Sequence, residues 1–217
     1  FYVKQGAFVY NRIELLNGLY LRTGLQFEQR SSIAGYKFSS YADSIYQNYK
    51  YKPASFEEYN AFYTDIIVSY TPFQKYLREP REKVILGSKY PTFLVQWRKG
   101  IPGILGGSTQ FDYVEYRLEW DFKVGLAGNS KLYVNTGKFY QMKKLQFIDY
   151  KYQYRIGPYL FANPLYSFQA LDSTYITFDR FYAAHYLHRF NGAILNKIPV
   201  LKLLQLTETA GGGMLYS

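Results

Sequence analysis

Cysteine is absent from the 217 residues of this chain, and only two residues are histidine. The lack of cysteine excludes a small scaffold held together by disulfides. Long hydrophobic runs are missing too, because no uninterrupted apolar stretch exceeds four residues, as in Phe181–Ala184. A membrane-spanning helix needs about 20 such residues, so transmembrane helices are excluded.

Aromatic residues are abundant instead. They make up 21% of the chain, with 26 tyrosines, while charged residues make up 19%. This much apolar material excludes a structureless polar chain. Tyr and Trp concentrate where an apolar surface meets water, including the aromatic girdles of membrane β-barrels. Since a domain has roughly 100 to 200 residues, we predict one domain over residues 1–217.

Alternation of apolar and polar residues dominates the sequence. In Tyr116–Val124 the apolar side chains hold the even positions, whereas in Leu19–Glu28 they hold the odd positions. Strands of about 10 alternating residues fit a tilted bilayer crossing. We therefore predict an all-β fold, an antiparallel transmembrane β-barrel of the outer-membrane type, with about eight to ten strands in this chain.

The alternation assigns side chains to two faces. The predicted lipid-facing residues are Leu19, Leu21, Leu25, Phe27, Leu118, Trp120, Phe122 and Val124. The predicted lumen-facing residues are Arg12, Glu14, Arg22, Glu28, Glu115, Arg117, Glu119, Asp121 and Lys123. A ladder of alternating charges around water explains the second set more simply than a catalytic carboxylate pair, because cations share the face.

The first hairpin allows a prediction of register. The turn signal Asn17-Gly18 separates two alternating segments whose odd positions must share a face, which requires a loop of odd length. A three-residue loop over 16–18 satisfies this and places Gly18 in a left-handed conformation. The predicted neighbours across the hairpin are Leu15 with Leu19, Ile13 with Leu21, Arg12 with Arg22, and Tyr10 with Gly24.

Other strands are predicted from the same pattern. A second hairpin turns through Leu126–Ser130, and long polar connections cover Glu28–Asn60 and Phe73–Tyr90. Short turns on one side and long loops on the other are typical of outer-membrane barrels. The further candidate strands are Phe62–Thr71, Thr92–Arg98, Lys131–Gly137, Lys151–Ile156, Tyr175–Arg189 and Leu203–Tyr216.

Motifs for catalysis or metal binding are sparse. His185 and His188 are three positions apart, so a regular strand places them on opposite faces, and no cysteine completes a zinc site. No G-x-S-x-G occurs, and Ser88 lacks the glycine spacing of a phosphate-binding loop. We therefore predict no catalytic residue, no metal and no cofactor.

The formal net charge is +10. Basic surfaces attract nucleic acid, but these lysines and arginines are spread among strands and loops without a recognition helix or an RNP-type aromatic motif. Attraction to anionic lipid, or a lumen that favours anions, fits a membrane barrel better. We predict no nucleic-acid partner.

Several stretches carry a family resemblance. Tyr76–Phe93 with Arg98–Gly103, and then His188–Gly192, Leu195–Pro199 and Leu206–Gly211, resemble the barrel region of a Bacteroidetes-type outer-membrane family of unknown function. Members carry a carboxypeptidase-regulatory-like β-sandwich before a C-terminal barrel that is distantly similar to bacterial surface-antigen barrels. The resemblance covers about residues 60 to 217 best. It implies a barrel, and no catalytic residue is carried over from the family.

The chain departs from that family in lacking the β-sandwich and a closing strand after Tyr216, and Phe1 starts directly in patterned sequence without a signal peptide. We therefore expect a mature chain or an internal fragment, and a partial barrel of a longer protein. In the surface-antigen group the intact barrel would contain more strands.

The expected function is that of an integral, multi-pass barrel of the Gram-negative cell outer membrane. It would act in transport, surface assembly or as a scaffold of a larger envelope complex, and not as an enzyme. Expected partners are outer-membrane lipid or lipopolysaccharide, and other outer-membrane or periplasmic proteins.

Two alternatives remain open. One is an outer-membrane barrel hydrolase, which requires His185 or Ser88 to meet a carboxylate in space. The other is a soluble lipocalin-like ligand-binding barrel, in which Trp120 and Phe122 point inward.

Overall fold

The computed structural model describes residues 2–34, 55–153, 164–168, 170–171, 174–192, 195–197, 203 and 206–217. Eight strands form the main sheet, and each pairs antiparallel with its neighbours. In sheet order they are β1 (Tyr2–Leu16), β2 (Leu19–Ser32), β3 (Tyr59–Tyr70), β6 (Thr92–Gly100), β7 (Gln110–Lys123), β8 (Asn129–Lys144), β11 (Arg180–Arg189) and β12 (Thr209–Tyr216). The prediction of an all-β antiparallel fold is confirmed.

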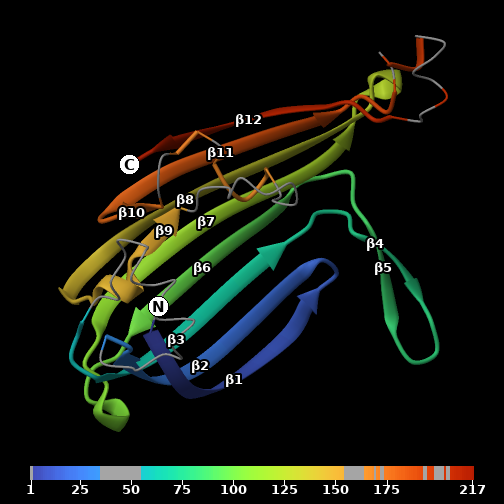
Figure 1. The fold of residues 1–217 in the computed structure, drawn as a ribbon. Helices are drawn as coiled ribbons and strands as arrows, with labels where there is room; N and C mark the ends of the chain where they lie inside the picture. The colour runs from blue at the N-terminus through green and yellow to red at the C-terminus, as the bar shows by residue number, and fades with distance from the viewer. Residues whose placement is uncertain are drawn as a thin grey trace.

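The main sheet is strongly curved, with a concave and a convex face (Figure 1). Strands β1 and β12 are its two edges, and they do not pair with each other. The part of the chain that the structure describes is therefore an open, curved sheet, and no closed barrel is present in it.

Two small sheets and four single turns of 3₁₀-helix complete the described elements. The small sheets are β4 (Lys75–Arg78) with β5 (Lys83–Gly87), and β9 (Lys151–Gln153) with β10 (Tyr175–Thr177). The 3₁₀ turns are η1 (Ile104–Gly106), η2 (Gly125–Ala127), η3 (Phe147–Asp149) and η4 (Leu195–Lys197). Among the described residues, no helix has the length and apolar character needed to cross a membrane.

The first hairpin follows the predicted register except at its turn. Ile13 lies opposite Leu21, and the pairs Arg12–Arg22 and Tyr10–Gly24 are also as predicted. The predicted pair of Leu15 with Leu19 is wrong, because Leu16 faces Leu19 across a two-residue turn. A bulge in β1 between Glu14 and Leu16 leaves Leu15 without a partner in β2. This extra residue keeps the odd positions of the two strands on the same face. Gly18 has the expected left-handed conformation, with φ +81°.

The predicted separation of short turns from long loops is wrong. Because the strands alternate in direction, the Asn17-Gly18 turn and the connection 71–91 leave the sheet at the same end. The strand ends that flank the other long connection, Ser32 of β2 and Tyr59 of β3, lie at the opposite end of the sheet. The predicted second hairpin is present, but its turn covers residues 124–128 and not Leu126–Ser130, since Lys123 faces Asn129.

Several predicted strands differ from those observed. The strand predicted over Lys131–Gly137 is longer, because β8 covers Asn129–Lys144. Of the strand predicted over Lys151–Ile156, residues Lys151–Gln153 form β9 in a separate sheet, and residues 154–156 lie outside the described ones. The long strand Tyr175–Arg189 is divided into β10 and β11 at residues 178–179. The last strand begins at Thr209 and not at Leu203.

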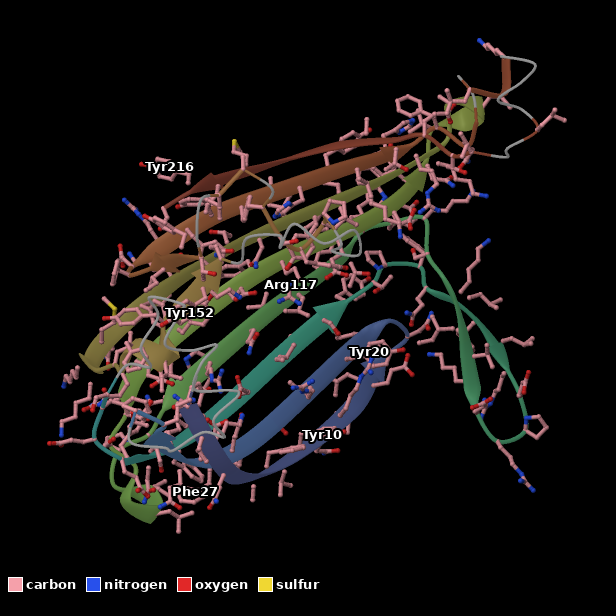
Figure 2. All side chains as sticks on the ribbon, in the orientation of Figure 1. Tyr10, Tyr20, Phe27, Arg117, Tyr152 and Tyr216 are labelled. Carbon is pink, nitrogen blue, oxygen red and sulfur yellow. The ribbon has the colours of Figure 1, made fainter. Side chains whose placement is uncertain are left out.

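We call the described residues between β8 and β11 (145–153, 164–168, 170–171 and 174–179) the insert, and it lies against the concave face of the sheet. It contains η3, β9 and β10, and Tyr152 of β9 lies on the concave side of the sheet (Figure 2). A mainly aromatic core joins the insert to the sheet. Its buried members are Tyr59, Ala61, Tyr63, Phe111, Tyr113, Phe139, Phe168, Phe181 and Ala183.

Candidate functional site

Strand register divides the side chains of the main sheet into two continuous sets. One row crosses seven strands on the concave face: Arg12, Arg22, Ile67, Gln96, Glu115, Gly137 and Phe181. The neighbouring convex row crosses all eight strands: Ile13, Leu21, Val68, Val95, Tyr116, Thr136, Tyr182 and Tyr216. The concave row contains charges and the convex row contains none.

The register also locates the residues singled out in the sequence. The set Arg12, Glu14, Arg22, Glu28, Glu115, Arg117, Glu119, Asp121 and Lys123 lies on the concave side. The set Leu19, Leu21, Leu25, Phe27, Leu118, Trp120 and Phe122 lies on the convex side. Val124 follows the end of β7 and belongs to the turn. Figure 2 shows Arg117 on the concave side and Phe27 on the opposite side.

A first buried ion cluster joins the insert to β2. Arg30 lies between two carboxylates, with its Nη2 2.6 Å from Glu28 Oε2 and its Nη1 2.6 Å from Asp149 Oδ1. The side chains of Arg30, Glu28 and Asp149 are 6%, 2% and 3% exposed. Tyr63 donates a hydrogen bond to Asp149 Oδ1 at 2.6 Å, and Lys4 pairs with the second oxygen of Glu28 at 2.7 Å. Each charge therefore has an opposite charge beside it, as burial requires.

A second cluster joins the insert to β7. Glu115 is 2% exposed, and its two oxygens accept from Arg117 at 2.9 Å and from Lys151 of the insert at 2.8 Å. Tyr113 donates to the same oxygen as Lys151, at 2.6 Å. Asp149 and Lys151 are two positions apart, so the insert contacts the sheet through one anion and one cation. Each sits against an opposite charge of the concave face.

Aromatic contacts hold the far part of the insert. Phe168 packs on His185 of β11 with ring centroids 4.4 Å apart, and Tyr166 meets Tyr133 of β8 at 5.0 Å. Gly213 of β12 lies opposite His185, where a Cβ would come within 2.8 Å of the imidazole. A cavity of about 810 Å³ lies beside these contacts, between the insert and β11–β12.

The two histidines lie on opposite faces, as predicted, because His185 pairs with Tyr133 and His188 with Ser130. His188 Nδ1 is 2.8 Å from Ser130 Oγ, and its Nε2 is 3.0 Å from the carbonyl of Ala127. This serine and histidine pair is absent from the sequence-based candidates. Ser130 has no exposed surface, so the pair fastens β11 to the neighbouring turn and is closed to a substrate.

The hydrolase alternative required a carboxylate near Ser88 or His185. Ser88 Oγ donates to the carbonyl of Pro72 and accepts from the Tyr90 amide, while His185 packs against aromatic rings. Among the described residues, no ion pair or hydrogen bond joins either side chain to a carboxylate. No group of three or more potential metal ligands occurs in the described part either.

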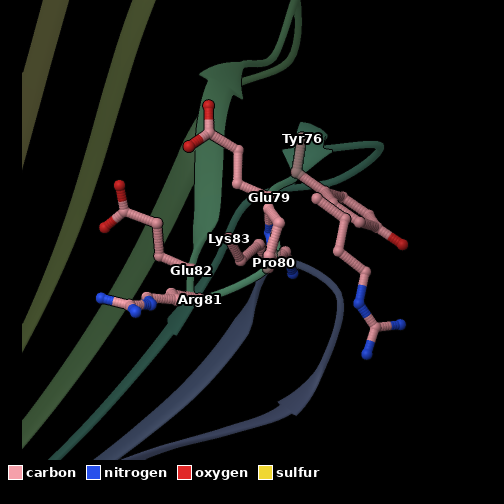
Figure 3. Close-up of a pocket in the computed structure, with 7 residues that line it drawn as sticks. Tyr76, Glu79, Pro80, Arg81, Glu82 and Lys83 are labelled. Atoms are coloured by element: carbon pink, nitrogen blue, oxygen red, sulfur yellow. The ribbon is translucent and has the colours of Figure 1, made fainter.

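The β4–β5 hairpin carries a hollow of about 390 Å³ at its tip (Figure 3). Charges of both signs line it, and the lining side chains are exposed or half-buried. The hollow is lined by Tyr76, Arg78, Glu79, Pro80, Arg81, Glu82 and Lys83. Because nothing there is enclosed, the concave face with its insert is the stronger candidate site.

Sequence reasoning did not single out Arg30, Asp149 or Lys151. Arg30 and Asp149 are 119 positions apart, so no local spacing relates them. The available signal was weaker: Arg30 continues the even polar positions of β2, which place it on the face of Glu28.

The fold and the site define a class of protein: an antiparallel all-β domain with a polar, charged concave face, an apolar convex face and an insert held by buried ion clusters. Residues 1–217 match the C-terminal domain of a family of unknown function (DUF5686), and the chain belongs to that family. A search of curated proteins found no match to this chain.

Proposed function

We propose that this chain forms part of the wall of an integral outer-membrane β-barrel. The observation that carries the proposal is the exposed apolar surface on the convex face, which includes Val68, Val95 and Tyr116. A continuous apolar surface across eight strands is unfavourable in water and favourable against hydrocarbon. In a lipocalin-like barrel the apolar set would instead line the interior.

The concave face fits a lumen, because its buried charges are paired across strands and with the insert. A closed barrel of about eight strands has an interior just wide enough for side chains. Here the same space contains the insert with its own two-stranded sheet of β9 and β10. The proposed barrel therefore has more strands than the main sheet, which supports a partial barrel of the Bacteroidetes-type family suggested by the sequence.

We infer a role in transport, surface assembly or as a scaffold within a larger envelope complex. The insert occupies the space through which a solute would pass, so it would restrict passage. Outer-membrane lipid or lipopolysaccharide would surround the convex face.

Site-directed labelling tests the membrane orientation. The chain has no cysteine, so one fluorophore can be placed at Leu118→Cys on the convex face or at Glu119→Cys on the concave face. The full-length protein, with any cysteine outside residues 1–217 replaced by serine, is labelled and reconstituted in vesicles containing a lipid with a quencher on its acyl chain. We expect strong quenching at position 118 and little at 119. Equal weak quenching at both positions would support a soluble barrel and overturn the proposal.

A further inference from the structure

Two arginines face each other on the concave side of the first hairpin. Arg12 of β1 and Arg22 of β2 are direct partners in the ladder. Side chains at such positions have Cβ atoms about 5 Å apart, and like charges there destabilise a sheet. The pair therefore does not contribute to the stability of the hairpin.

The nearby carboxylates all have other cations. Glu14 pairs with Lys83, Glu28 with Lys4 and Arg30, and Asp65 with Arg98. These three are the acidic side chains on the concave face of β1, β2 and β3. Within the described residues, neither Arg12 nor Arg22 forms an ion pair, which leaves two uncompensated positive charges on this part of the wall.

Tyrosines position both guanidinium groups. Arg12 Cζ lies 4.5 Å from the ring centroid of Tyr20, and Arg22 Cζ lies 5.5 Å from that of Tyr10. Figure 2 shows both tyrosines on the concave side of the hairpin. Stacking on a ring covers the flat face of a guanidinium but leaves its in-plane N–H groups free to donate. Two forked donors are thus directed into the concave space.

We propose that Arg12 and Arg22 form a binding site for the phosphate group of a solute that enters the concave space. A planar fork of N–H donors matches phosphate oxygens bidentately, and two such forks supply both charge and geometry. This inference rests on the proposed function, because it assigns a substrate class to the proposed lumen.

The test is a titration of the detergent-solubilised full-length protein with inorganic phosphate, followed by ³¹P line broadening. In Arg12→Gln/Arg22→Gln we expect phosphate to bind roughly tenfold more weakly than in the wild type. The Arg12→Lys/Arg22→Lys variant keeps both charges but loses the forks, so it should bind with intermediate strength. A matched control, Lys138→Gln/Arg180→Gln, removes two facing cations from the other side of the sheet and should leave binding unchanged.

Equal phosphate binding by the wild type and Arg12→Gln/Arg22→Gln would overturn the inference, as would an equal loss in the control. If circular dichroism shows that Arg12→Gln/Arg22→Gln does not fold, the two arginines stabilise the protein by pairing with a carboxylate outside the described residues. That result would count against a phosphate site. The Lys variant then provides the binding comparison. Labelling at positions 118 and 119 does not involve these arginines, so failure here leaves the membrane orientation supported.

Discussion

Arg30 is the residue on which the first ion cluster depends, because it is the cation between Glu28 and Asp149. In Arg30→Gln the carboxylate of Asp149 stays buried and keeps only the hydroxyl of Tyr63 as a strong donor. We expect the free energy of unfolding to fall by about 3 kcal/mol, since an unpaired buried charge is costly. Reversible guanidinium titration of the detergent-folded protein measures the change.

Arg180 provides the control for this loss of an arginine. It is exposed and forms no ion pair among the described residues, so Arg180→Gln should change stability by less than about 0.5 kcal/mol. Similar effects of the two substitutions would show that the buried cluster contributes little to folding.

Lys151 has a smaller predicted effect than Arg30. In Lys151→Met, Glu115 keeps its hydrogen bonds from Arg117 and Tyr113, so no carboxylate is left alone. We expect a loss of about 1.5 kcal/mol, at the lower end of the range for a hydrogen bond to a charged group, because the Lys151 side chain is 28% exposed. Hydrogen exchange should increase at the amides of β9 before those of β7, because the substitution loosens the insert and not the sheet.

Lys123→Met is the matched control, since Lys123 is exposed on the same face of β7 and forms no ion pair or hydrogen bond with the described part of the insert. Faster exchange in β9 after this substitution would contradict a specific role for the pair of Lys151 with Glu115.

At the scale of elements, Gly212 and Gly213 of β12 allow the packing on the two faces of the sheet to be compared. A Cβ on Gly213 would approach the His185 ring to 2.8 Å, whereas a Cβ on Gly212 would meet nothing within 4 Å. We expect Gly213→Ala to destabilise the protein by about 1 to 3 kcal/mol through overpacking, and Gly212→Ala to be neutral. Thermal unfolding compares them, and equal midpoints would mean that the contact of Phe168 with His185 is not tightly packed.

The strands of the main sheet were predictable because alternation with a period of two is a local signal. It placed the side chains of Tyr116–Lys123 on alternate faces and paired Arg12 with Arg22. The bulge at Leu15 was not predictable, since parity demands one extra residue but does not say in which position. A three-residue loop, or a two-residue turn with a bulge in β1, satisfies the same alternation of apolar and polar residues.

The insert escaped prediction for a different reason. Strands β9 and β10 have three residues each, too few for a pattern, and their partners lie far away in sequence. The contact of Lys151 with Glu115 spans 36 positions, and that of Asp149 with Arg30 spans 119. Only tertiary packing shows that these charges meet, so the strongest part of the candidate site came from the structure.

At the scale of the whole molecule, the main sheet has an apolar convex face and a charged concave face, so its two sides suit different surroundings. The buried carboxylates of the concave face are tolerated because each one meets a cation, while the convex face carries apolar side chains. The insert lies across the concave face and is held there by ion pairs at Asp149 and Lys151. If the concave face lines a lumen, the insert determines how wide the lumen is.

Releasing the insert should therefore increase conductance. The variant Asp149→Ala/Lys151→Ala removes one anion and one cation, so the net charge is unchanged and any effect reflects space. In planar bilayers we expect a several-fold higher single-channel conductance with unchanged ion selectivity. Asp121→Ala/Lys131→Ala is the matched control, because this exposed pair at 3.1 Å lies on the same face without joining the insert. An unchanged conductance, together with hydrogen exchange showing that the insert is released, would mean that it does not obstruct the proposed lumen.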